Sequence, residues 1–308
     1  MQMVKKRKRS MKELICSEAV APYVFALPFI LSILIFFVYP IITTVIMSFQ
    51  EVLPGQTTFI GWRNYEIMLS NRHFFVALQN SVVYTLLTLL VLIPLPMVLA
   101  ALLNSKSAPG KNAFRSTLFV PSLTSVVVAG IIFRLILGDL DTALFNRIVT
   151  ALGFEAQNWL TTGGQTVAYA ALVVMATWRW LGVNMMYFLS GLEAIPKDLY
   201  ESASIDGANA IQQFFRISVP MLRPVTIYVL TISIYGGMAM FTESFMLFNG
   251  NNSPMNVGLT IVGLLYRQGF EQNRMGRGAA IGLMLMVFTL IVNLIQLRAT
   301  GQFRKERD

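Results

Sequence analysis

Three charged residues fall within long apolar stretches of the sequence, namely Arg134, Arg179 and Glu243. A charge at membrane depth is costly, so each is a candidate for a paired or functional side chain. Arg134 lies three residues from the end of its stretch, which favours a side chain that extends to the outer headgroups. Arg179 lies deeper and suits burial against a carboxylate. Glu243 suits either a pair with Arg179 or a position facing a watery cavity, and the sequence leaves both open.

No residue pattern in the chain indicates catalysis. The only histidine, His73, lies in an expected outer loop, H-E-x-x-H is absent, and the only cysteine, Cys16, lies in no metal-ligand spacing. Two arginines and one glutamate do not make a set of nucleophile and base. A phosphate-binding loop is absent too, because Gly110-Lys111 lacks the preceding glycine and the following hydroxyl. The chain is therefore expected to be neither an enzyme nor an ATP-binding subunit.

The composition of the chain indicates a membrane protein. Of its 308 residues 55% are hydrophobic and only 13% are charged, whereas about a quarter of a typical soluble domain is charged. A helix needs about 20 apolar residues to cross the hydrocarbon core. Segments of that length cover 21–49, 80–103, 114–137, 166–192, 225–248 and 278–297. The predicted fold class is therefore all-α, a polytopic membrane protein with six transmembrane helices.

The basic residues predict how these helices are oriented. With a cytoplasmic N-terminus, 16 Lys and Arg residues fall on the inner side and six in the outer loops. Such an excess marks the cytoplasmic side, so both termini are expected inside a bacterial plasma membrane. The expected organisation is a basic tail over 1–19, a six-span domain over 20–298 and a tail over 299–308. Because the basic residues adjoin apolar segments, the net charge of +9 suits membrane lipid and not nucleic acid.

The inner segment 193–224 is too elaborate for a simple connector. It reads EAIPKDLYESASIDGANAIQQFFRISVPMLRP, which predicts a helix, a turn and a second helix. Gly207 can take the left-handed conformation that ends the first helix, and Asn209 can cap the second. Pro220 and Pro224 are expected to stop that helix before the fifth span. An amphipathic hairpin lying on the inner leaflet is the alternative interpretation of the same residues.

A family resemblance is carried by Glu201, Ala203, Gly207, Ile217, Val219 and Pro220. These residues have the spacing of the EAA loop. Because of this spacing, the chain resembles the permeases of binding-protein-dependent ABC importers. Two positions depart mildly from the motif, since Ser202 replaces its middle alanine and Val219 its leucine. The surrounding 192–196 and 206–208 resemble the maltose-type, carbohydrate-importing branch. Sugar importers of this branch contain two permeases, and this chain resembles the larger one at Pro28-Phe29, Tyr39-Pro40, Ser48-Phe49, Phe59, Gly61, Asn64 and Tyr65.

The resemblance implies an importer of two permease chains, two cytoplasmic ATPase subunits and an extracytoplasmic solute-binding protein. ATP and magnesium would then be held by the ATPases, and this chain would hold no cofactor or metal. Its loop would be the coupling helix, in which Glu201 offers a carboxylate to a basic partner and Gly207 lets the two short helices fold sharply. The implied coupling residues are Glu201, Ser202, Ala203, Asp206, Gly207, Ile217 and Pro220.

A sugar or oligosaccharide cargo suggests residues for a path through the membrane. Aromatic faces stack on the C–H groups of sugar rings, and planar polar side chains satisfy sugar hydroxyls. The candidates are Trp178, Arg179, Trp180, Asn184, Tyr187, Phe241 and Glu243. Aromatic residues of membrane helices also serve as packing or interface residues, so that interpretation stays open for each.

An ion-coupled secondary carrier for a small polar solute is the alternative function. Such carriers often contain paired broken helices in repeated halves, and the first three and last three spans show no convincing match. The elaborate inner loop would also have no role in a carrier. The outer stretch 138–165 is expected to be partly helical and to face a partner.

Overall fold

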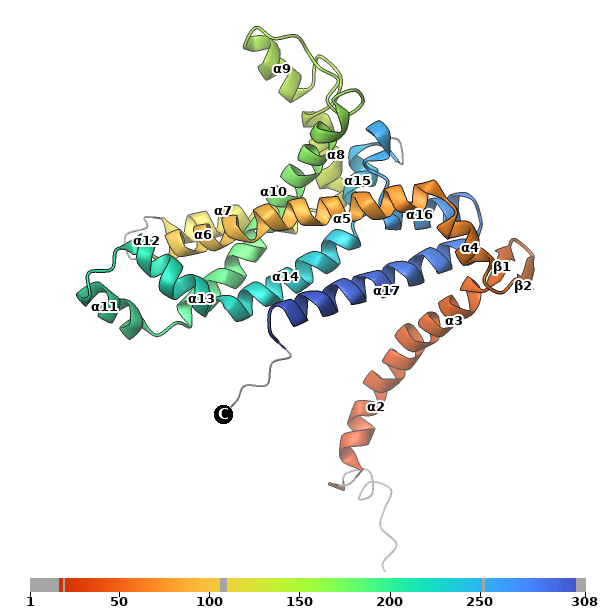
Figure 1. The fold of residues 1–308 in the computed structure, drawn as a ribbon, viewed down its shortest axis with the longest axis horizontal. Helices are drawn as coiled ribbons and strands as arrows, with labels where there is room; N and C mark the ends of the chain where they lie inside the picture. Colours follow the sequence, from red (N-terminus) through yellow and green to blue (C-terminus); the bar gives the residue numbers. More distant parts are fainter. Residues whose placement is uncertain (1–16, 19, 106–109, 251–252, 303–308) are drawn as a thin grey trace, which may run out of the picture.

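The computed structural model describes residues 17–18, 20–105, 110–250 and 253–302. Helices dominate these residues and form an elongated bundle, with the short helices α11 (Lys197–Ile205) and α12 (Ala210–Gln213) at one end. At the opposite end lies the hairpin of β1 (Gln50–Leu53) and β2 (Gln56–Phe59) (Figure 1). The two ends suit the inner and outer sides that the sequence predicts.

The described residues contain four helical runs that are long and apolar enough to cross a membrane, over Ala21–Ser48, Arg72–Asn104, Gly164–Glu193 and Met275–Ala299. Two further pairs of helices pass the same test but are sharply bent, Lys111–Leu123 with Val126–Ile136 and Ala210–Met221 with Arg223–Met238. If each bent pair is one span, six spans result, as the sequence predicts. These spans are identified from the length and composition of the helices alone.

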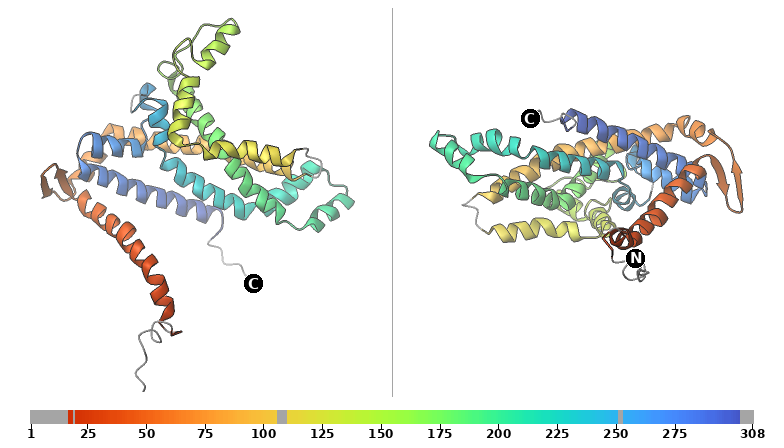
Figure 2. Two further views of the ribbon diagram at one scale, coloured as in Figure 1. Left: turned by 180° about the vertical axis from the view of Figure 1, so that it is seen from behind. Right: turned by 90° about the horizontal axis from the view of Figure 1, so that it is seen from below.

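The first run consists of α2 (Ala21–Ile33), a π-helical turn η1 (Leu34–Val38) and α3 (Tyr39–Ser48). It stands away from the bundle over most of its length, as the view from behind shows (Figure 2), and neither α2 nor η1 contains a buried residue. Only the outer end of α3 is anchored. There, α17 (Met275–Ala299) packs against α3, and a Cβ at Gly276 would clash with the carbonyl oxygen of Gln50.

A short two-stranded hairpin accompanies the helices of the predicted all-α fold class. β1 and β2 pair antiparallel from Gln50 with Phe59 to Leu53 with Gln56, around a Pro54-Gly55 turn in which Gly55 has φ +78°. Proline followed by glycine is a typical turn pair, so a local signal was present. The short helix α4 (Arg63–Leu69) follows the hairpin. Its Asn64 amide donates to the carbonyl oxygens of Ser48 and Gln50 at 2.8 and 2.9 Å, which ties the hairpin to α3.

The second and third candidate spans in chain order are interrupted at prolines. The second consists of α5 (Arg72–Leu92) and α6 (Pro94–Asn104), and the third of α7 (Lys111–Phe119), the 3-10 turn η2 (Val120–Leu123) and α8 (Val126–Ile136). The predicted third span 114–137 is thus not one straight helix, because its halves meet at 99°. Pro121 cannot donate a helical hydrogen bond, which explains the break in the α-helix at η2.

The fourth candidate span in chain order, α10 (Gly164–Glu193), is the longest single helix in the described chain, and α14 (Arg223–Met238) lies beside both α10 and α17. The predicted fifth span 225–248 is wrong as a continuous helix, because α14 ends at Met238 and α15 (Thr242–Leu247) begins after a break. Gly236-Gly237 weakens helix formation just before that break. The segment after α15 contains η4 (Pro254–Asn256), α16 (Ile261–Tyr266) and the π-helical turn η5 (Arg267–Glu271).

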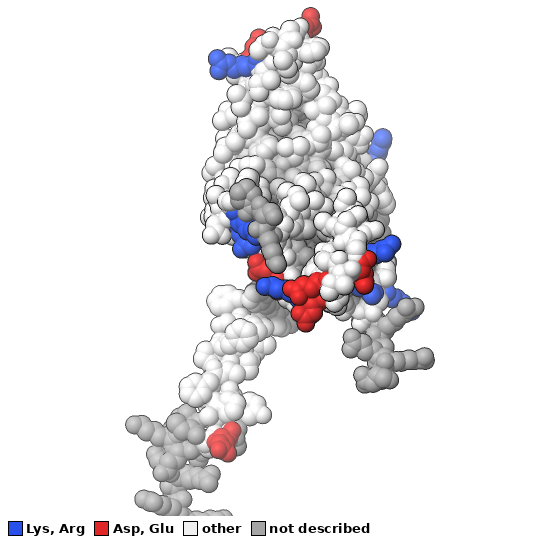
Figure 3. All heavy atoms as spheres, turned by 90° about the vertical axis from the view of Figure 1, so that its left-hand side faces the viewer, with Lys and Arg blue, Asp and Glu red and all other residues white. Residues whose placement is uncertain are grey.

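Charged side chains are unevenly distributed on the face that carries α11 and α12. Seen from the side of α11 and α12, Lys, Arg, Asp and Glu gather in a band at the end of the bundle and again at the tip above it (Figure 3). The surface between these two levels is nearly free of charge on this face. Such a charge-poor belt between two charged rims is what a chain that crosses a hydrocarbon core requires.

Candidate functional site

The loop between α10 and α14 forms a small projection of two short helices joined by a turn, as predicted, at the end of the bundle opposite the hairpin. α11 runs from Lys197 to Ile205, and Gly207 then has φ +81°, which confirms its predicted left-handed conformation. Asn209 caps α12 through a reciprocal pair of hydrogen bonds with Gln212, both of 2.9 Å. The chain continues through a π-helical turn η3 (Phe214–Ser218) into α13 (Val219–Met221). Local sequence signals thus build the projection before any packing is considered.

Side-chain hydrogen bonds join the two arms of this projection. The hydroxyl groups of Tyr200 and Ser218 lie 2.9 Å apart, and the Gln213 amide donates to Ser204 Oγ at 2.9 Å and to the Ala208 carbonyl oxygen at 3.1 Å. The base of the projection is apolar, since Ile195 and Leu222 are buried in a cluster with residues of α6 and α10. Because hydrogen bonds join its arms and its base is well packed, the projection can move as one body.

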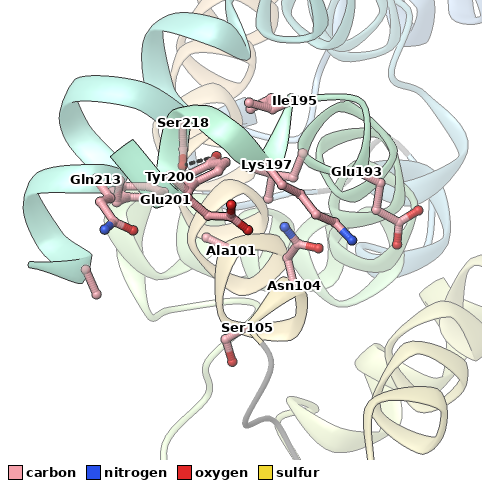
Figure 4. A pocket seen from close by; sticks show the side chains of 13 residues that line it. Ala101, Asn104, Ser105, Glu193, Ile195, Lys197, Tyr200, Glu201, Gln213 and Ser218 are labelled. Atoms are coloured by element: carbon pink, nitrogen blue, oxygen red, sulfur yellow. Dashed lines mark hydrogen bonds between the residues drawn. The ribbon is translucent and has the colours of Figure 1, made fainter. Parts of the chain in front are cut away.

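A hollow of about 620 Å³ lies beside α11. It is lined from α6 by Ala101, Asn104 and Ser105, from the end of α10 by Leu192 and Glu193, and from the projection by Ile195, Lys197, Tyr200, Glu201, Ala210, Gln213, Phe214 and Ser218. Glu201, Lys197 and Asn104 lie around the same space (Figure 4). The Glu201 carboxylate therefore lines a recess that is open to a basic group from outside.

The other predicted coupling residues divide between a second hollow and the open surface. The second hollow, of about 320 Å³, is lined by Ala203, Asp206, Gly207, Ala208, Gln212, Gln213, Arg216 and Ile217. Ser202 and Pro220 are exposed. The sequence analysis missed Ile211 and Phe215, which are both largely exposed on the second arm. Their signal was available, because apolar side chains in a charged loop need a reason to face outward.

Pro220 and Pro224 do not stop the second arm in the way that the sequence predicts. Pro220 lies within the three-residue α13, and Pro224 lies in the first turn of α14, where a missing amide hydrogen costs nothing. The chain bends by 66° between Ala210–Met221 and Arg223–Met238 instead of leaving helical structure. The projection is consequently joined to α14 by a bent but nearly continuous helix.

Two of the three charged residues in the apolar stretches, Arg179 and Glu243, form an ion pair. Arg179 Nη1 on α10 lies 3.3 Å from Glu243 Oε1 on α15, and the two side chains are only 16% and 17% exposed. The structure thus realises the first of the two predicted environments for Glu243. The Arg179 guanidinium also lies 5.2 Å from the centre of the Trp180 ring. Its Nε atom and the Thr177 hydroxyl are buried without a hydrogen-bond partner in the described chain.

Two predicted pathway residues are already engaged elsewhere. Asn184 is buried, and its amide donates to the Leu92 carbonyl oxygen at 3.0 Å. That oxygen lacks its usual helical donor because the residue four positions on is Pro96. Tyr187 packs edge-on against Tyr228 with ring centres 5.2 Å apart. Asn184 therefore repairs the break between α5 and α6.

The predicted aromatic residues lie in different surroundings. Trp178 packs against Phe133 in the outer part of the core, with ring centres 5.5 Å apart, whereas Trp180 is 42% exposed. Phe241 precedes α15 and joins a ring cluster with Phe245, Tyr266 and Phe270, in which neighbouring centres are 5.1 to 5.6 Å apart. The structure thus brings Arg179, Trp180 and Glu243 together and assigns Trp178 to packing.

Arg134 lies at the end of α8 and reaches the outer loop. Its Nη1 donates to Asn249 Oδ1 at 2.9 Å, and its side chain is exposed. A polar network that the sequence analysis missed holds the rest of this loop. The Asn80 amide on α5 donates to the carbonyl oxygens of Asn256 and Leu259, and the Tyr169 hydroxyl donates to Asn80 Oδ1 at 3.0 Å. An asparagine at the first position of the predicted span 80–103 was the only signal of this network in the sequence.

Known proteins share both the sequence and the architecture of this chain. Residues 92–300 match the family model described as "Binding-protein-dependent transport system inner membrane component". The arabinooligosaccharides transport system permease protein AraP of Bacillus subtilis is 52% identical over 96% of this chain and 93% of its own length. The trehalose/maltose transport system permease protein MalF of Thermococcus litoralis is 27% identical over 94% and 96%.

A solved structure shows the same fold. It is a chain from the crystal structure of a bacterial alginate ABC transporter in complex with an alginate pentasaccharide-bound periplasmic protein. The TM-score is 0.82 and the sequence identity 21%, and the match covers 96% of this chain and 99% of the other. The bent helices and the broken fifth span thus occur in a chain whose architecture is matched by an experimentally determined structure.

Proposed function

The chain belongs to the family of binding-protein-dependent transport system inner membrane components, and we propose that it is the permease subunit of an ATP-driven sugar importer. In this proposal a solute-binding protein delivers the sugar from outside, and the chain forms the membrane path together with a second permease. ATP and magnesium are held by two cytoplasmic ATPase subunits. The chain itself carries out no chemical reaction.

The observation that carries this proposal is the exposed projection of α11 and α12. It combines a carboxylate in a recess, Glu201, with exposed apolar side chains at Ile211 and Phe215. A groove on an ATPase that supplies a basic group and an apolar surface would fit both features. Because the arms are cross-linked and packed on the ends of α6 and α10, movement of the projection would reach the spans. An ion-coupled carrier would give these features no partner.

The cargo is proposed from the relatives and from the residues beside the ion pair. The 52% identical protein carries the name of an arabinooligosaccharide system, which supports an arabinose-containing oligosaccharide here. Trp180 offers a partly exposed ring, and Arg179 retains a buried donor without a partner in the described chain. Sugars use both kinds of group, so Trp180, Arg179 and Glu243 are the pathway residues best supported by the geometry.

The orientation in the membrane is also a proposal. The projection is placed in the cytoplasm with both termini, and the hairpin β1–β2 with the loop after α15 is placed outside. The excess of Lys and Arg over the inner segments supports this direction.

The first test is to extract the chain from native membranes with mild detergent at low salt and to identify the proteins that co-purify. The proposal expects an ATPase subunit, a second permease and a solute-binding protein, and the ligand of that binding protein then identifies the cargo. A variant with Glu201→Lys serves as the matched comparison, since it should lose the ATPase while keeping the second permease. Reproducible recovery of the unaltered chain alone or as a homodimer would contradict the proposal.

A further inference from the structure

The short helix α9 (Leu144–Ala151) turns one polar side chain, that of Asn146, into the protein. Asn146 is completely buried, and its amide donates to the carbonyl oxygens of Leu140 and Gln157 at 3.1 and 3.0 Å. Its Oδ1 accepts hydrogen bonds from the Gln157 backbone and from Trp159 Nε1 at 3.0 and 2.7 Å. This one side chain folds the following loop back onto the helix.

The apolar side of α9 is turned outward. Residues four apart along a helix lie on one face, and here that face carries Leu144, Ile148 and Leu152, which are 53%, 50% and 69% exposed. Leu140 before the helix is 73% exposed, and Phe154 after it is 69% exposed. A surface helix in water shows the reverse arrangement, with its apolar side inward. The exposed side of α9 therefore fits an apolar environment.

The position of α9 shows where that environment lies. α9 follows α8 and stands at the end of it, apart from the rest of the bundle (Figure 1). α8 carries its own exposed apolar residues up to Leu135, and with α7 it passes the test for a membrane span. The stripe on α9 is thus continuous along the chain with the apolar surface of a span. It begins where that span reaches its outer end.

Polar and aromatic residues around α9 suit the edge of a bilayer. Arg134 at the end of α8 and Arg147 on α9 are both exposed and can reach phosphate groups. Trp159 is partly buried and packs against Phe145 with ring centres 5.0 Å apart. Tryptophan is enriched at the level of the headgroups, where its ring is amphipathic. A surface that docks a water-soluble protein reversibly would carry more polar residues than this stripe does.

We propose that α9 lies in the outer leaflet of the membrane, with Leu144, Ile148 and Leu152 in contact with lipid. The loop that ends at Trp159 then covers the polar side of the helix and faces the extracytoplasmic space. This surface anchors the outer end of α8 at the level of the headgroups and thereby helps to fix the direction that α8 takes after the 99° bend. The sequence analysis expected the stretch 138–165 to face a partner, and this proposal makes lipid the partner of α9.

The test places a nitroxide at single positions in the assembled transporter in lipid nanodiscs. In a Cys16→Ser background, Leu144→Cys, Ile148→Cys and Thr150→Cys are labelled one at a time, and Leu290→Cys on the exposed face of α17 is the lipid reference. Thr150 is the matched control because it is exposed on the opposite, polar side of the same helix. None of these changes removes Asn146, so the hydrogen bonds that fold the loop onto the helix are kept, and Thr150→Cys loses only the bonds from its hydroxyl to the carbonyl oxygens of Asn146 and Arg147 within the helix.

Relaxation of the spin by oxygen, which concentrates in lipid, is compared with relaxation by a water-soluble nickel chelate. Labels at Leu144 and Ile148 should resemble the Leu290 reference, with oxygen access exceeding nickel access several-fold, whereas the Thr150 label should favour nickel. Nickel access at Leu144 and Ile148 equal to that at Thr150 would place the stripe in water and overturn the proposal. Low access to both reagents, or protection that appears only with the solute-binding protein, would make it a protein interface and overturn it equally.

Discussion

Single residues provide the ion pair and hydrogen bonds that buried charged and polar groups of this membrane protein require. Arg179 and Glu243 come from helices that are far apart in sequence, and their pairing removes two charges from contact with lipid. Asn184 supplies a hydrogen bond that Pro96 cannot give to the carbonyl oxygen of Leu92. The sequence offered a pair with Arg179 as one of two environments for Glu243, but only the packing of α10 against its neighbours selects that pair and identifies the partner of Asn184.

Removal of either member of the ion pair should leave the other charge buried and uncompensated. We expect Glu243→Ala or Arg179→Ala to destabilise the complex by about 3 kcal/mol, because a buried unpaired charge is more costly than a neutral site. Thermal unfolding of the solubilised transporter measures this effect. The exchange variant Arg179→Glu with Glu243→Arg should recover much of the loss, and Arg134→Gln, at an exposed arginine, should change stability little. Equal stability of the single variants and the unaltered protein would contradict the pairing.

The hydrogen bond from Asn184 makes a second prediction possible. Asn184→Leu keeps the side-chain size but leaves the Leu92 carbonyl oxygen buried and unsatisfied, which should cost about 1–3 kcal/mol. Pro96→Ala restores a backbone amide four residues after Leu92 and should therefore be less destabilising, or even stabilising, in the Asn184→Leu background. The four proteins of this cycle are compared by thermal unfolding. Simple addition of the two effects would mean that Asn184 and Pro96 are not linked through that carbonyl.

Whole elements differ in how well the sequence predicts them. The projection of α11 and α12 is encoded locally, by Gly207 at the end of one helix and Asn209 at the start of the next, and it was predicted. The break between α14 and α15 was not, because a run of apolar residues fits a continuous span equally well. What opens that helix is tertiary, since Ser244 Oγ donates to the Gly258 carbonyl oxygen and Glu243 is held by α10.

The turn in the projection predicts a specific loss of coupling. Gly207→Val forces a β-branched residue into the left-handed region, at a cost of about 1–2 kcal/mol, and should distort the angle between α11 and α12. Uptake should fall several-fold while ATP hydrolysis by the assembled complex persists, as measured in proteoliposomes. Gly153→Val is the matched control, because Gly153 has φ +87° but lies in the loop after α9. Equal loss of uptake in both variants would show that backbone strain alone, and not coupling, is responsible.

At the scale of the whole molecule, composition predicted a membrane protein with six spans, and the described residues contain four to six candidate spans, but composition did not predict how these helices pack. The first span illustrates the difference, since α2 and η1 bury no residue against the rest of the chain. Hydropathy reports only that such a helix prefers lipid, because lipid tails are as apolar as the interior of a bundle. The contacts that do anchor it, from Asn64 and Gly276 at the outer end of α3, depend on shape and on backbone oxygens.

The orientation of the whole molecule makes the last prediction. In a Cys16→Ser background, Gln56→Cys lies at the turn of the outer hairpin and Asp206→Cys at the tip of the inner projection, and both positions are exposed. A membrane-impermeant maleimide should label Gln56→Cys in intact cells, after removal of any outer membrane, and Asp206→Cys only after the plasma membrane is opened. The reason is the excess of basic residues on the inner segments, which resist transfer across the membrane. The reverse pattern would place α11 and α12 outside, where no ATPase could reach them, and the coupling mechanism would fail with the topology.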